Sequence, residues 1–382
     1  MSTGTPYKGL KVVELARILA GPWIGQCIAD LGAEVIKVEA PGGDDTRRWG
    51  PPFIERDHPD GTKETVATYF HATNRGKTSV CADFRDPEDL NKVKALIAES
   101  DVVIENFKVG SLVKFGLDYD SLSQDNPGLI YASVTGFGQT GPRATQPGYD
   151  FLIQGMSGII DVSGDPDGIP MKAGVAIMDV FTGLYGVIGV QAALAARAKS
   201  GKGQHIDLSL LDSGVGVLGH QGMIYLLGDQ LPKRLGNGHP SIVPYDTYEC
   251  SDGHLIIACG NDGQFRALAR VLGADDWIDD PDFATNPARV QNRSTVNAAV
   301  NEKTKDWTKD DLIAALEVAK VPVGPINTVA DVMADPQIQH RGMEIAPEGV
   351  RGIRTPLKFS HSELALDKAG PLLGTGKWGF KS

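Results

Sequence analysis

The sequence lacks the cysteine and histidine patterns of disulfide-linked and zinc-binding proteins. Its four cysteines form no C-x-x-C pair, and no pair of histidines has the spacing of a metal site. We therefore expect no bound metal and a reducing, cytoplasmic location. The sequence also has no run of eighteen apolar residues, and its first twenty residues lack the charged and apolar regions of a signal peptide. These absences predict a protein without a membrane span.

Positive charge is in short supply as well. The chain has 37 Lys and Arg against 48 Asp and Glu, which gives a formal net charge of −11. Because nucleic acid is bound through an excess of basic residues, we do not expect it as a partner. The motifs G-x-S-x-G, Walker A and H-E-x-x-H are absent too. Their absence argues against several classes of hydrolase, nucleotide-binding protein and metalloprotease.

What is present is an alternation of short apolar runs with helical patterns. Strands are predicted at Leu10–Ala16, Glu34–Ala40, Ser79–Phe84, Asp101–Phe107 and Leu129–Phe137. Helices are predicted over Gly21–Leu31, from Asp86 onward, and from Asp179 to about Lys199. Strands separated by helices of this length indicate βαβ units, so we predict an α/β fold with a mostly parallel sheet.

The pattern changes after about Pro232. The segments YDTYEC and HLIIAC predict a β-hairpin across Ser251–Gly253, followed by helices near 263–272 and 295–318. VPVGPIN is then expected to be an extended linker. We therefore predict a large domain over 1–205, a linker helix over 206–230, a small α+β domain over 231–322, and a linker with the C-terminal part of the large domain over 323–382.

Two turns in the first half are candidate ligand sites. Ala20–Pro22 lies where the first strand meets its helix, a place that borders the ligand crevice in open α/β sheets. It lacks the G-x-G-x-x-G spacing that holds a dinucleotide, and it is equally an ordinary turn with Pro at the helix start. The segment Asp44–Trp49 contains Arg47, Arg48 and Trp49, which could bind a carboxylate or stack on a flat group, or could simply be solvated.

Two further features involve acidic residues and glycine. Asp179 follows an apolar run and precedes a helical pattern, so we expect it to cap the helix, where free N–H groups favour the ionised carboxylate. Such a carboxylate can be a nucleophile or only a helix cap. The turn Gly260–Gly263 offers backbone N–H groups that could stabilise an oxyanion, or it could only join a strand to a helix.

The order of these segments along the chain is more specific than any one of them. The sequence resembles the class III CoA-transferases, the family of formyl-CoA transferase, carnitine-CoA transferase and the α-methylacyl-CoA racemases, from about Leu10 to about Gly374. The matching segments are LKVVELARILAGP, LGAEVIKVEAPGGDDTRRWGPPF, NRGKTS, SDVVIENFKVGSL, YASVTGFGQTGP, GYDFLIQGMSG, DVFTGLYG, KSGKGQHIDLSLLDS and VPVGPINTV.

The resemblance implies a fold, an assembly and a mechanism. It implies a Rossmann-like large domain built from both ends of the chain, a small domain from its middle, and an interlaced, ring-like homodimer. The family nucleophile falls on Asp179, which would form a mixed anhydride and then an aspartyl-CoA thioester. Coenzyme A and acyl-CoA are implied as substrates, together with a small carboxylic acid, and no permanently bound cofactor is implied.

The resemblance also assigns roles to individual residues. Those matched to coenzyme A binding are Leu19, Ala20, Arg85, Asn106, Phe107, Lys114 and Tyr149. Those matched to the substrate or to the loop over the intermediates are Gly260, Asn261, Asp262, Gly263, Arg47 and Trp49. The sequence departs from formyl-CoA transferase at Ala40 and Thr135, which replace an arginine and a lysine, so phosphate binding would rest on other cations.

Tyr149 bears on which branch of the family the chain belongs to. The racemases have a histidine acid or base in a GHD segment, and a tyrosine is a poor base at neutral pH. Asp262 stands at the position of the racemase glutamate. The small-domain sequence most resembles succinate–hydroxymethylglutarate and other dicarboxylate CoA-transferases, with Arg47, Arg48 and Arg234 as candidate partners of the remote carboxylate. The alternatives are an oxalate-type transferase, a racemase and a non-catalytic paralogue that binds coenzyme A.

Overall fold

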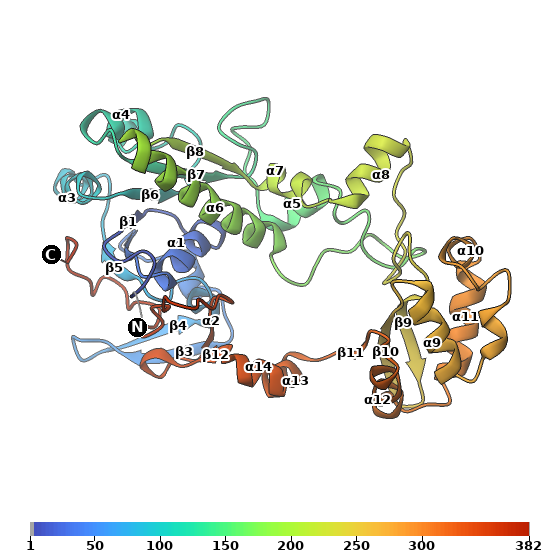
Figure 1. Cartoon of the computed structure of the whole chain (residues 1–382). Helices are drawn as coiled ribbons and strands as arrows, with labels where there is room; N and C mark the ends of the chain where they lie inside the picture. Colours follow the sequence, from blue (N-terminus) through green and yellow to red (C-terminus); the bar gives the residue numbers. More distant parts are fainter. Residues whose placement is uncertain (1–3, 382) are drawn as a thin grey trace. The chain divides into compact units, whose positions relative to one another are not determined.

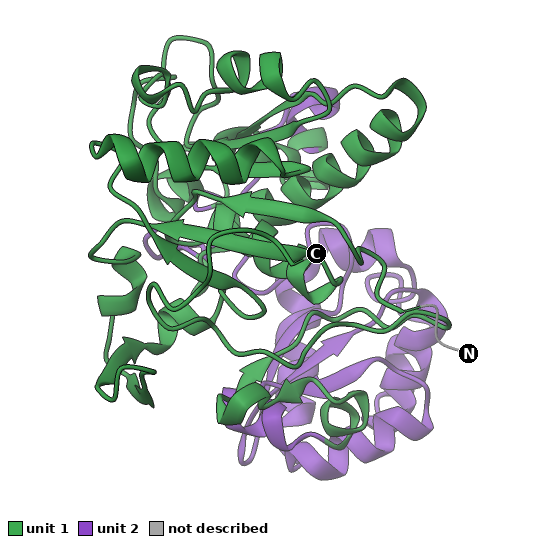
Figure 2. Cartoon of the chain, turned by 90° about the vertical axis from the view of Figure 1, so that its left-hand side faces the viewer, with its two compact units in different colours: residues 1–159, 173–223, 336–382 green, residues 160–172, 224–335 purple. Residues whose placement is uncertain are grey.

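The computed structural model describes residues 4–381, which fold into two compact units (Figures 1 and 2). Unit 1 comprises the described residues up to 159 together with 173–223 and those from 336 onward, and unit 2 comprises 160–172 and 224–335. Residues 160–172 were expected in the large domain. They belong to unit 2 because Arg234 donates to the carbonyls of Asp161 and Asp165 and because the Gly236 N–H bonds to the Gly164 carbonyl.

Unit 1 is built around a six-stranded parallel sheet. Its strands, in spatial order, are β5 (Thr78–Cys81), β2 (Glu34–Glu39), β1 (Lys11–Glu14), β6 (Val102–Glu105), β7 (Ile130–Thr135) and β8 (His205–Ser209). Numbered by their order in the chain, these strands run 3-2-1-4-5-6, which is the Rossmann order. The predicted α/β class is confirmed, and the strand order reverses between β1 and β6.

Helices α1 (Ala20–Asp30) and α6 (Ile177–Ser200) cover one face of this sheet and α3 (Pro87–Ala98) the other, and unit 1 contains further helices around them. These are α2 (Thr68–His71), α4 (Tyr119–Asp125), α5 (Asp150–Met156), α7 (Leu210–Gly216), α8 (His220–Gly228, shared with unit 2) and α14 (Pro336–Arg341). Short antiparallel pairs join β3 (Phe53–Asp57) to β4 (Lys63–Ala67) and β12 (Glu344–Ile345) to β13 (Gly352–Ile353). The segment 206–230 is therefore not one linker helix, because it contains the end of β8 and two separate helices.

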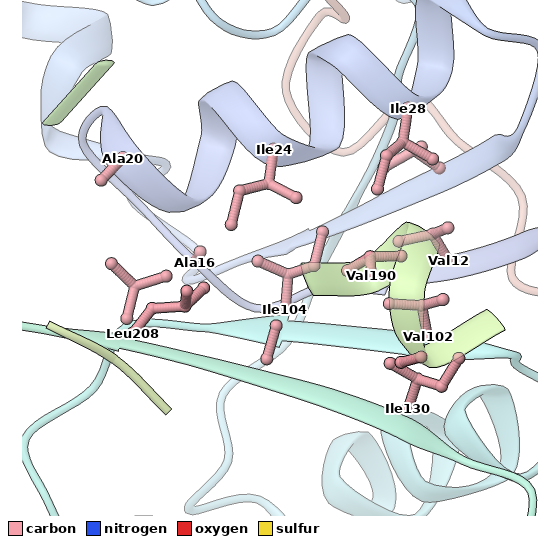
Figure 3. Close-up of a cluster of buried hydrophobic side chains, with 14 of the residues drawn as sticks. Val12, Ala16, Ala20, Ile24, Ile28, Val102, Ile104, Ile130, Val190 and Leu208 are labelled. Carbon is pink, nitrogen blue, oxygen red and sulfur yellow. The ribbon is translucent and has the colours of Figure 1, made fainter. Parts of the chain in front are cut away.

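One face of the sheet is covered by α1 and α6. Figure 3 shows Ile24 and Ile28 of α1 above Val12 and Ile104 of the sheet, and all four are fully buried. The two helices approach closely because α6 carries glycine where they meet: a Cβ on Gly186 would lie 2.3 Å from Ile24. The opposite face is covered by α3 and by the segment before α4, with Val93, Ile97 and Leu117 buried there.

Helix α6 is long and apolar enough, by length and composition alone, to cross a membrane. One such helix is weak support for a membrane span, because the core helix of a globular domain passes the same test. Here α6 packs against α1 and β8, with Met178, Val190 and Ala193 in the core of unit 1.

Unit 2 is a small α+β structure with its own core. The predicted hairpin is confirmed as β9 (Tyr245–Cys250) and β10 (Gly253–Ala258), and β11 (Val323–Pro325), which we expected to be linker, pairs with β10. The helices are α9 (Asp262–Val271), α10 (Asn286–Gln291), α11 (Arg293–Thr304), α12 (Lys309–Val318) and α13 (Val329–Ala334). The helix predicted over 295–318 is divided into α11 and α12, because Thr308 caps a new helix through the N–H of Asp311.

Candidate active site

Asp179 lies in the first turn of α6, not at its cap. The helix begins at Ile177 after Ala176, and the Met178 N–H donates to the Asp150 carboxylate at 2.7 Å. The carboxylate of Asp150, the first residue of α5, therefore caps the N-terminus of α6, the role that we expected for Asp179. Within residues 4–381, no hydrogen bond reaches the Asp179 carboxylate.

The surroundings of Asp179 favour its protonated form. Burial, followed by the negative charge of Asp150, raises the pKa of the Asp179 carboxyl to about 7. This is the opposite of the direction expected for a helix cap, because no donor compensates for the loss of water. Near neutral pH a large fraction of Asp179 is still ionised, and a poorly solvated carboxylate is a stronger nucleophile than a hydrated one.

Asp150 is held in place by neighbouring groups. Besides the Met178 N–H, its carboxylate accepts from Nε2 of Gln154 at 2.6 Å. Gln154 is fully buried, and its Oε1 accepts from the Ala173 N–H at 2.9 Å. The charge that acts on Asp179 therefore has a fixed position, tied to both α5 and the start of α6.

Tyr69 is a further candidate site residue, which the sequence did not indicate. The pKa of its hydroxyl is raised to about 12, by burial first and then by the negative charges of Asp179 and Asp150. Trp49, which we predicted at the substrate, packs edge-on against the Tyr69 ring at 5.4 Å between centroids and is 44% exposed. Tyr69 lies in the short helix α2 just after β4 and belongs to no recognisable motif, so the sequence offers no signal for it.

Tyr149 lies at the N-terminus of α5 and is 65% exposed. Its position is set by a close crossing of two loops, since a Cβ on Gly148 would lie 2.6 Å from the Cα of Gly136. The exposed ring is free to contact a ligand next to Asp150.

The turn between β1 and α1 contains the predicted coenzyme A contacts Leu19 and Ala20. Both side chains are buried, 8% and 4% exposed. Any contact of these two residues with a ligand would therefore be made chiefly by the backbone. This turn and the segment after β6 lie where the strand order reverses, the place at which open α/β sheets bind ligands.

Asn106 follows β6 and faces that turn. Its Oδ1 accepts from the Arg17 N–H at 3.0 Å, and its Nδ2 donates to the Arg17 carbonyl at 2.6 Å. The amide that we predicted at coenzyme A is thus bonded on both sides to the protein backbone.

The other predicted contacts lie on an aromatic cluster. The rings of Phe107 and Phe115 pack against Phe84 at 6.0 and 5.7 Å. Lys114 lies over the Phe115 ring, and the neighbouring Arg85 is exposed and paired with Asp83. Arg85 and Lys114 are exposed cations that could bind phosphate.

Arg47 does not fit its predicted role at the substrate. It is 4% exposed, its guanidinium pairs with Glu39 at 2.7 Å and Glu64 at 2.8 Å, and it lies over the Phe70 ring. Arg47 is therefore a structural residue. Of the two other candidates for a remote carboxylate, Arg48 is exposed and paired with Asp45. Arg234 bonds to the loop that contains Asp161.

The Gly260–Gly263 turn opens α9 in unit 2. Asn261 caps the helix through the Gln264 N–H at 3.0 Å, and the Gly260 N–H donates to Oε1 of Gln264 at 2.7 Å. Asp262 accepts from the buried Arg289 at 2.8 Å. The Gly260 N–H, one of the expected oxyanion donors, is therefore already bonded within the loop.

Comparison with known proteins agrees with this architecture. The model of CoA-transferase family III matches residues 7–377. The succinate–glutarate CoA-transferase of Agrobacterium fabrum is 52% identical over 97% of this chain and 93% of its own length, and the mouse succinyl-CoA:glutarate CoA-transferase is 39% identical over 97% and 84%. A crystal structure of a CAIB/BAIF family protein from Brucella suis, 59% identical, superposes with a TM-score of 0.89 over 97% of both chains.

The family match covers nearly the whole chain. Coenzyme A thioesters and carboxylic acids are accordingly the substrates of this protein. The chain belongs to CoA-transferase family III.

Proposed function

We propose that this transferase moves coenzyme A from succinyl-CoA to a dicarboxylate of four to six carbons, with glutarate the first candidate, through a thioester on Asp179. The observation that carries the mechanism is the desolvated Asp179 carboxyl beside Asp150, whose pKa of about 7 leaves a reactive carboxylate at neutral pH. The acids come from the names of the relatives from Agrobacterium fabrum and mouse.

The proposed reaction begins when a carboxylate oxygen of Asp179 attacks the thioester carbonyl of succinyl-CoA. The C–S bond breaks, which gives an aspartyl–succinyl anhydride and the CoA thiolate. The thiolate then attacks the aspartyl carbonyl of the anhydride, which releases succinate and leaves an aspartyl-CoA thioester. The acceptor carboxylate repeats both steps in reverse, so atoms and charge balance without an added energy source.

Neighbouring residues would assist these steps without forming covalent bonds. Asp150 is held in place by Met178 and Gln154, and its negative charge would destabilise the Asp179 carboxylate and so keep it reactive. The raised pKa of Tyr69 keeps its hydroxyl protonated, so it can donate to an oxyanion. From the family resemblance, the Gly260–Gly263 loop would cover the reaction intermediates.

Racemase activity is disfavoured by the surroundings of Asp262. Oδ1 of Asp262 accepts from the fully buried Arg289 at 2.8 Å and from the Asn286 N–H at 2.9 Å, so this side chain holds the start of α9 in place, a structural role. Tyr149, in place of the racemase histidine, points the same way.

We also propose that the protein is an interlaced homodimer in a reducing compartment. Unit 1 has a cleft of about 1430 Å³, larger than a usual small-molecule pocket and lined in part by Val180, Leu184 and Val187 of α6. Leu184 and Ile188 are 42% and 57% exposed, which suits burial by a second chain. All four cysteines are free, as a reducing compartment would maintain them.

A panel of acceptor acids tests the substrate proposal. Purified protein is incubated with succinyl-CoA and, separately, glutarate, adipate, oxalate or a monocarboxylate such as hexanoate, and the new acyl-CoA is measured. We expect the highest kcat/KM with a dicarboxylate of four to six carbons. Preference for oxalate or for the monocarboxylate would refute the proposed acceptor class.

A further inference from the structure

The turn that joins β1 to α1 contains a strained backbone. Ile18 has a φ of 74°, in the left-handed region that a β-branched residue rarely enters. Such a conformation persists only where surrounding groups hold it, and it occurs preferentially at ligand and active sites. The side chains that hold Ile18 can be identified.

Asn106 clamps the residue before it. The oxygen and the nitrogen of the Asn106 side-chain amide both bond to Arg17: Oδ1 accepts the Arg17 N–H at 3.0 Å, and Nδ2 donates to the Arg17 carbonyl at 2.6 Å. Asn106 follows β6 and Arg17 follows β1, so this clamp joins the two strands between which the sheet order reverses.

A buried ion pair holds the turn on either side of Arg17. Nζ of Lys37 donates to the Ala16 carbonyl at 2.7 Å, and the Asp44 carboxylate accepts the Ile18 N–H at 3.2 Å. Lys37 and Asp44 are themselves paired at 3.0 Å, with side chains 1% and 0% exposed. The N–H of Ile18, the strained residue itself, is thus fixed by a carboxylate that the buried Lys37 holds in place.

A second buried lysine anchors this pair to α1. Glu14 is paired with Lys37 at 3.0 Å and with Lys77 at 2.7 Å, and Lys77 also donates to the Pro22 carbonyl at 2.9 Å. All three of these charged side chains are buried. Since each charge has an opposite partner, the network fixes both ends of the turn from Ala16 to Pro22.

We infer that Asn106 and the Lys37–Asp44 pair are positioning residues, which act on coenzyme A indirectly by holding the strained β1–α1 turn in the conformation that receives it. The inference rests on the proposed function and on the family resemblance, which matches Leu19 and Ala20 to coenzyme A binding. Because these two side chains are buried, the turn can contact a ligand chiefly through its backbone, and the backbone conformation then sets the affinity. If the clamp is lost, the turn relaxes toward ordinary φ values, and the apparent affinity falls with the fraction of competent molecules.

The test is a set of variants in Asn106 and Ile18 with coenzyme A binding measured by calorimetry. Asn106→Leu keeps the size of the side chain and removes both bonds, and we expect the dissociation constant to rise about tenfold. Glycine takes up a positive φ without strain, so adding Ile18→Gly should return the dissociation constant to within about threefold of wild type. Ile18→Gly alone should change it little.

Two results would overturn the inference. Unchanged binding in Asn106→Leu means that the clamp does not set the affinity. Weaker binding that Ile18→Gly fails to restore means that Asn106 touches the ligand directly. Asn106→Ser, too short to bond both groups of Arg17, is measured alongside in case Asn106→Leu does not fold, and it carries the same expectations.

Asn126→Leu is the matched control. Asn126 is half-buried like Asn106, and its Nδ2 donates to the Ser100 carbonyl at 2.9 Å, before the amino end of β6. This change should lower the melting temperature without affecting binding. Calorimetry needs neither an acceptor acid nor Asp179. If wild type binds coenzyme A but transfers it to no acid, the proposed function fails and the inference can still be tested.

Discussion

Asp179 and Asp150 are two carboxylates in contrasting surroundings, a common arrangement at catalytic sites. Asp150 accepts from Met178 and Gln154, whereas Asp179 is half-buried and accepts from no group within the described residues. The unequal distribution of donors is the reason we propose Asp179, and not Asp150, as the nucleophile.

The charge of Asp150 should be visible in the pH dependence of the reaction. In the proposed mechanism ionised Asp179 is the nucleophile, so kcat/KM of wild type should fall below a pH of about 7. Asp150→Asn removes the repulsion and keeps the size, so the fall should move to lower pH, although burial still holds the pKa above its ordinary value. The pH–rate profile measures this shift.

Asp101→Asn is the control for that experiment. Asp101 pairs with Arg197, which is 18 residues beyond Asp179 on α6 and therefore roughly 27 Å away. Its loss should leave the profile unchanged. A profile of Asp150→Asn that coincides with wild type would show that Asp150 does not act on Asp179.

The same pKa has a consequence for stability. The folded-state pKa of Asp179, about 7, exceeds its ordinary value of 3.8, so between these pH values the folded chain holds a proton that the unfolded chain releases. The contribution of Asp179 to the free energy of unfolding is therefore lost as pH rises from about 4 to about 7. Asp179→Asn removes the charge, and we expect it to raise the free energy of unfolding by about 1–3 kcal/mol at pH 8.

Urea unfolding of wild type and Asp179→Asn at pH 5 and pH 8 tests this prediction. The gain should be larger at pH 8, where the folded wild type carries the full buried charge. A variant no more stable than wild type at pH 8, or an equal gain at both values, would contradict it.

At the residue scale, the sequence indicated Asp179 only through its place in an ordered series of segments. Spacing predicted a helix cap, and the donor that a cap would use is taken by Asp150, 29 residues earlier. Arg47 and Asn106 look like ligand contacts in the sequence because their types suit anions and amides. Their partners, Glu39 and the Arg17 backbone, are distant in sequence and are found only in the folded chain.

At the element scale, the loop before α9 depends on one buried arginine. Arg289 is fully buried, donates to the carbonyls of Val243 and Phe283 at 2.7 Å, and lies over the Phe265 ring. Its only carboxylate partner among the described residues is Asp262, so that side chain ties the glycine turn to the core of unit 2.

Asp262→Ala should therefore loosen the start of α9. It leaves the Arg289 charge without a partner, and we expect local opening to become easier by about 2 kcal/mol. Hydrogen exchange of peptides covering 260–272 would report this as faster exchange. Asp276 is an exposed acidic residue in the same unit, and in Asp276→Ala the same peptides should exchange at the wild-type rate. Unchanged exchange in Asp262→Ala would show that the ion pair does not hold the loop.

The elements that the sequence predicted are those with long or strongly patterned signals. The first strands of the parallel sheet are short apolar runs, and β9 and β10 alternate around a Gly-containing turn. The last strand, β8, was missed because HIDLS mixes polar and apolar residues, and its segment was predicted as a linker helix. β11 was missed because it is three residues long and ends in proline. The β3–β4 hairpin was missed because its alternation is weak, with exposed and half-buried residues along FIERD.

At the scale of the whole molecule, the sequence gives only part of the assembly. Leu184, Tyr185 and Ile188 make α6 look like a uniformly apolar helix, yet all three are more than 40% exposed. A core helix would bury them, and the proposed homodimer would cover this face of α6 with a second chain.

Sedimentation velocity tests the proposed dimer. Because interlaced chains cannot separate without unfolding, we expect a species of twice the chain mass that persists on dilution to nanomolar concentration. A monomer that retains full activity would contradict the interlaced assembly.

The most direct test of the central claim is intact-mass analysis after rapid acid quench of protein mixed with succinyl-CoA. We predict a mass increase equal to coenzyme A less one water, located by peptide mapping on Asp179 and lost on addition of glutarate. Asp179→Ala should form no adduct and lose exchange activity on the order of a thousandfold or more. Exchange at the wild-type rate in Asp179→Ala, or an adduct on another residue, would contradict the account.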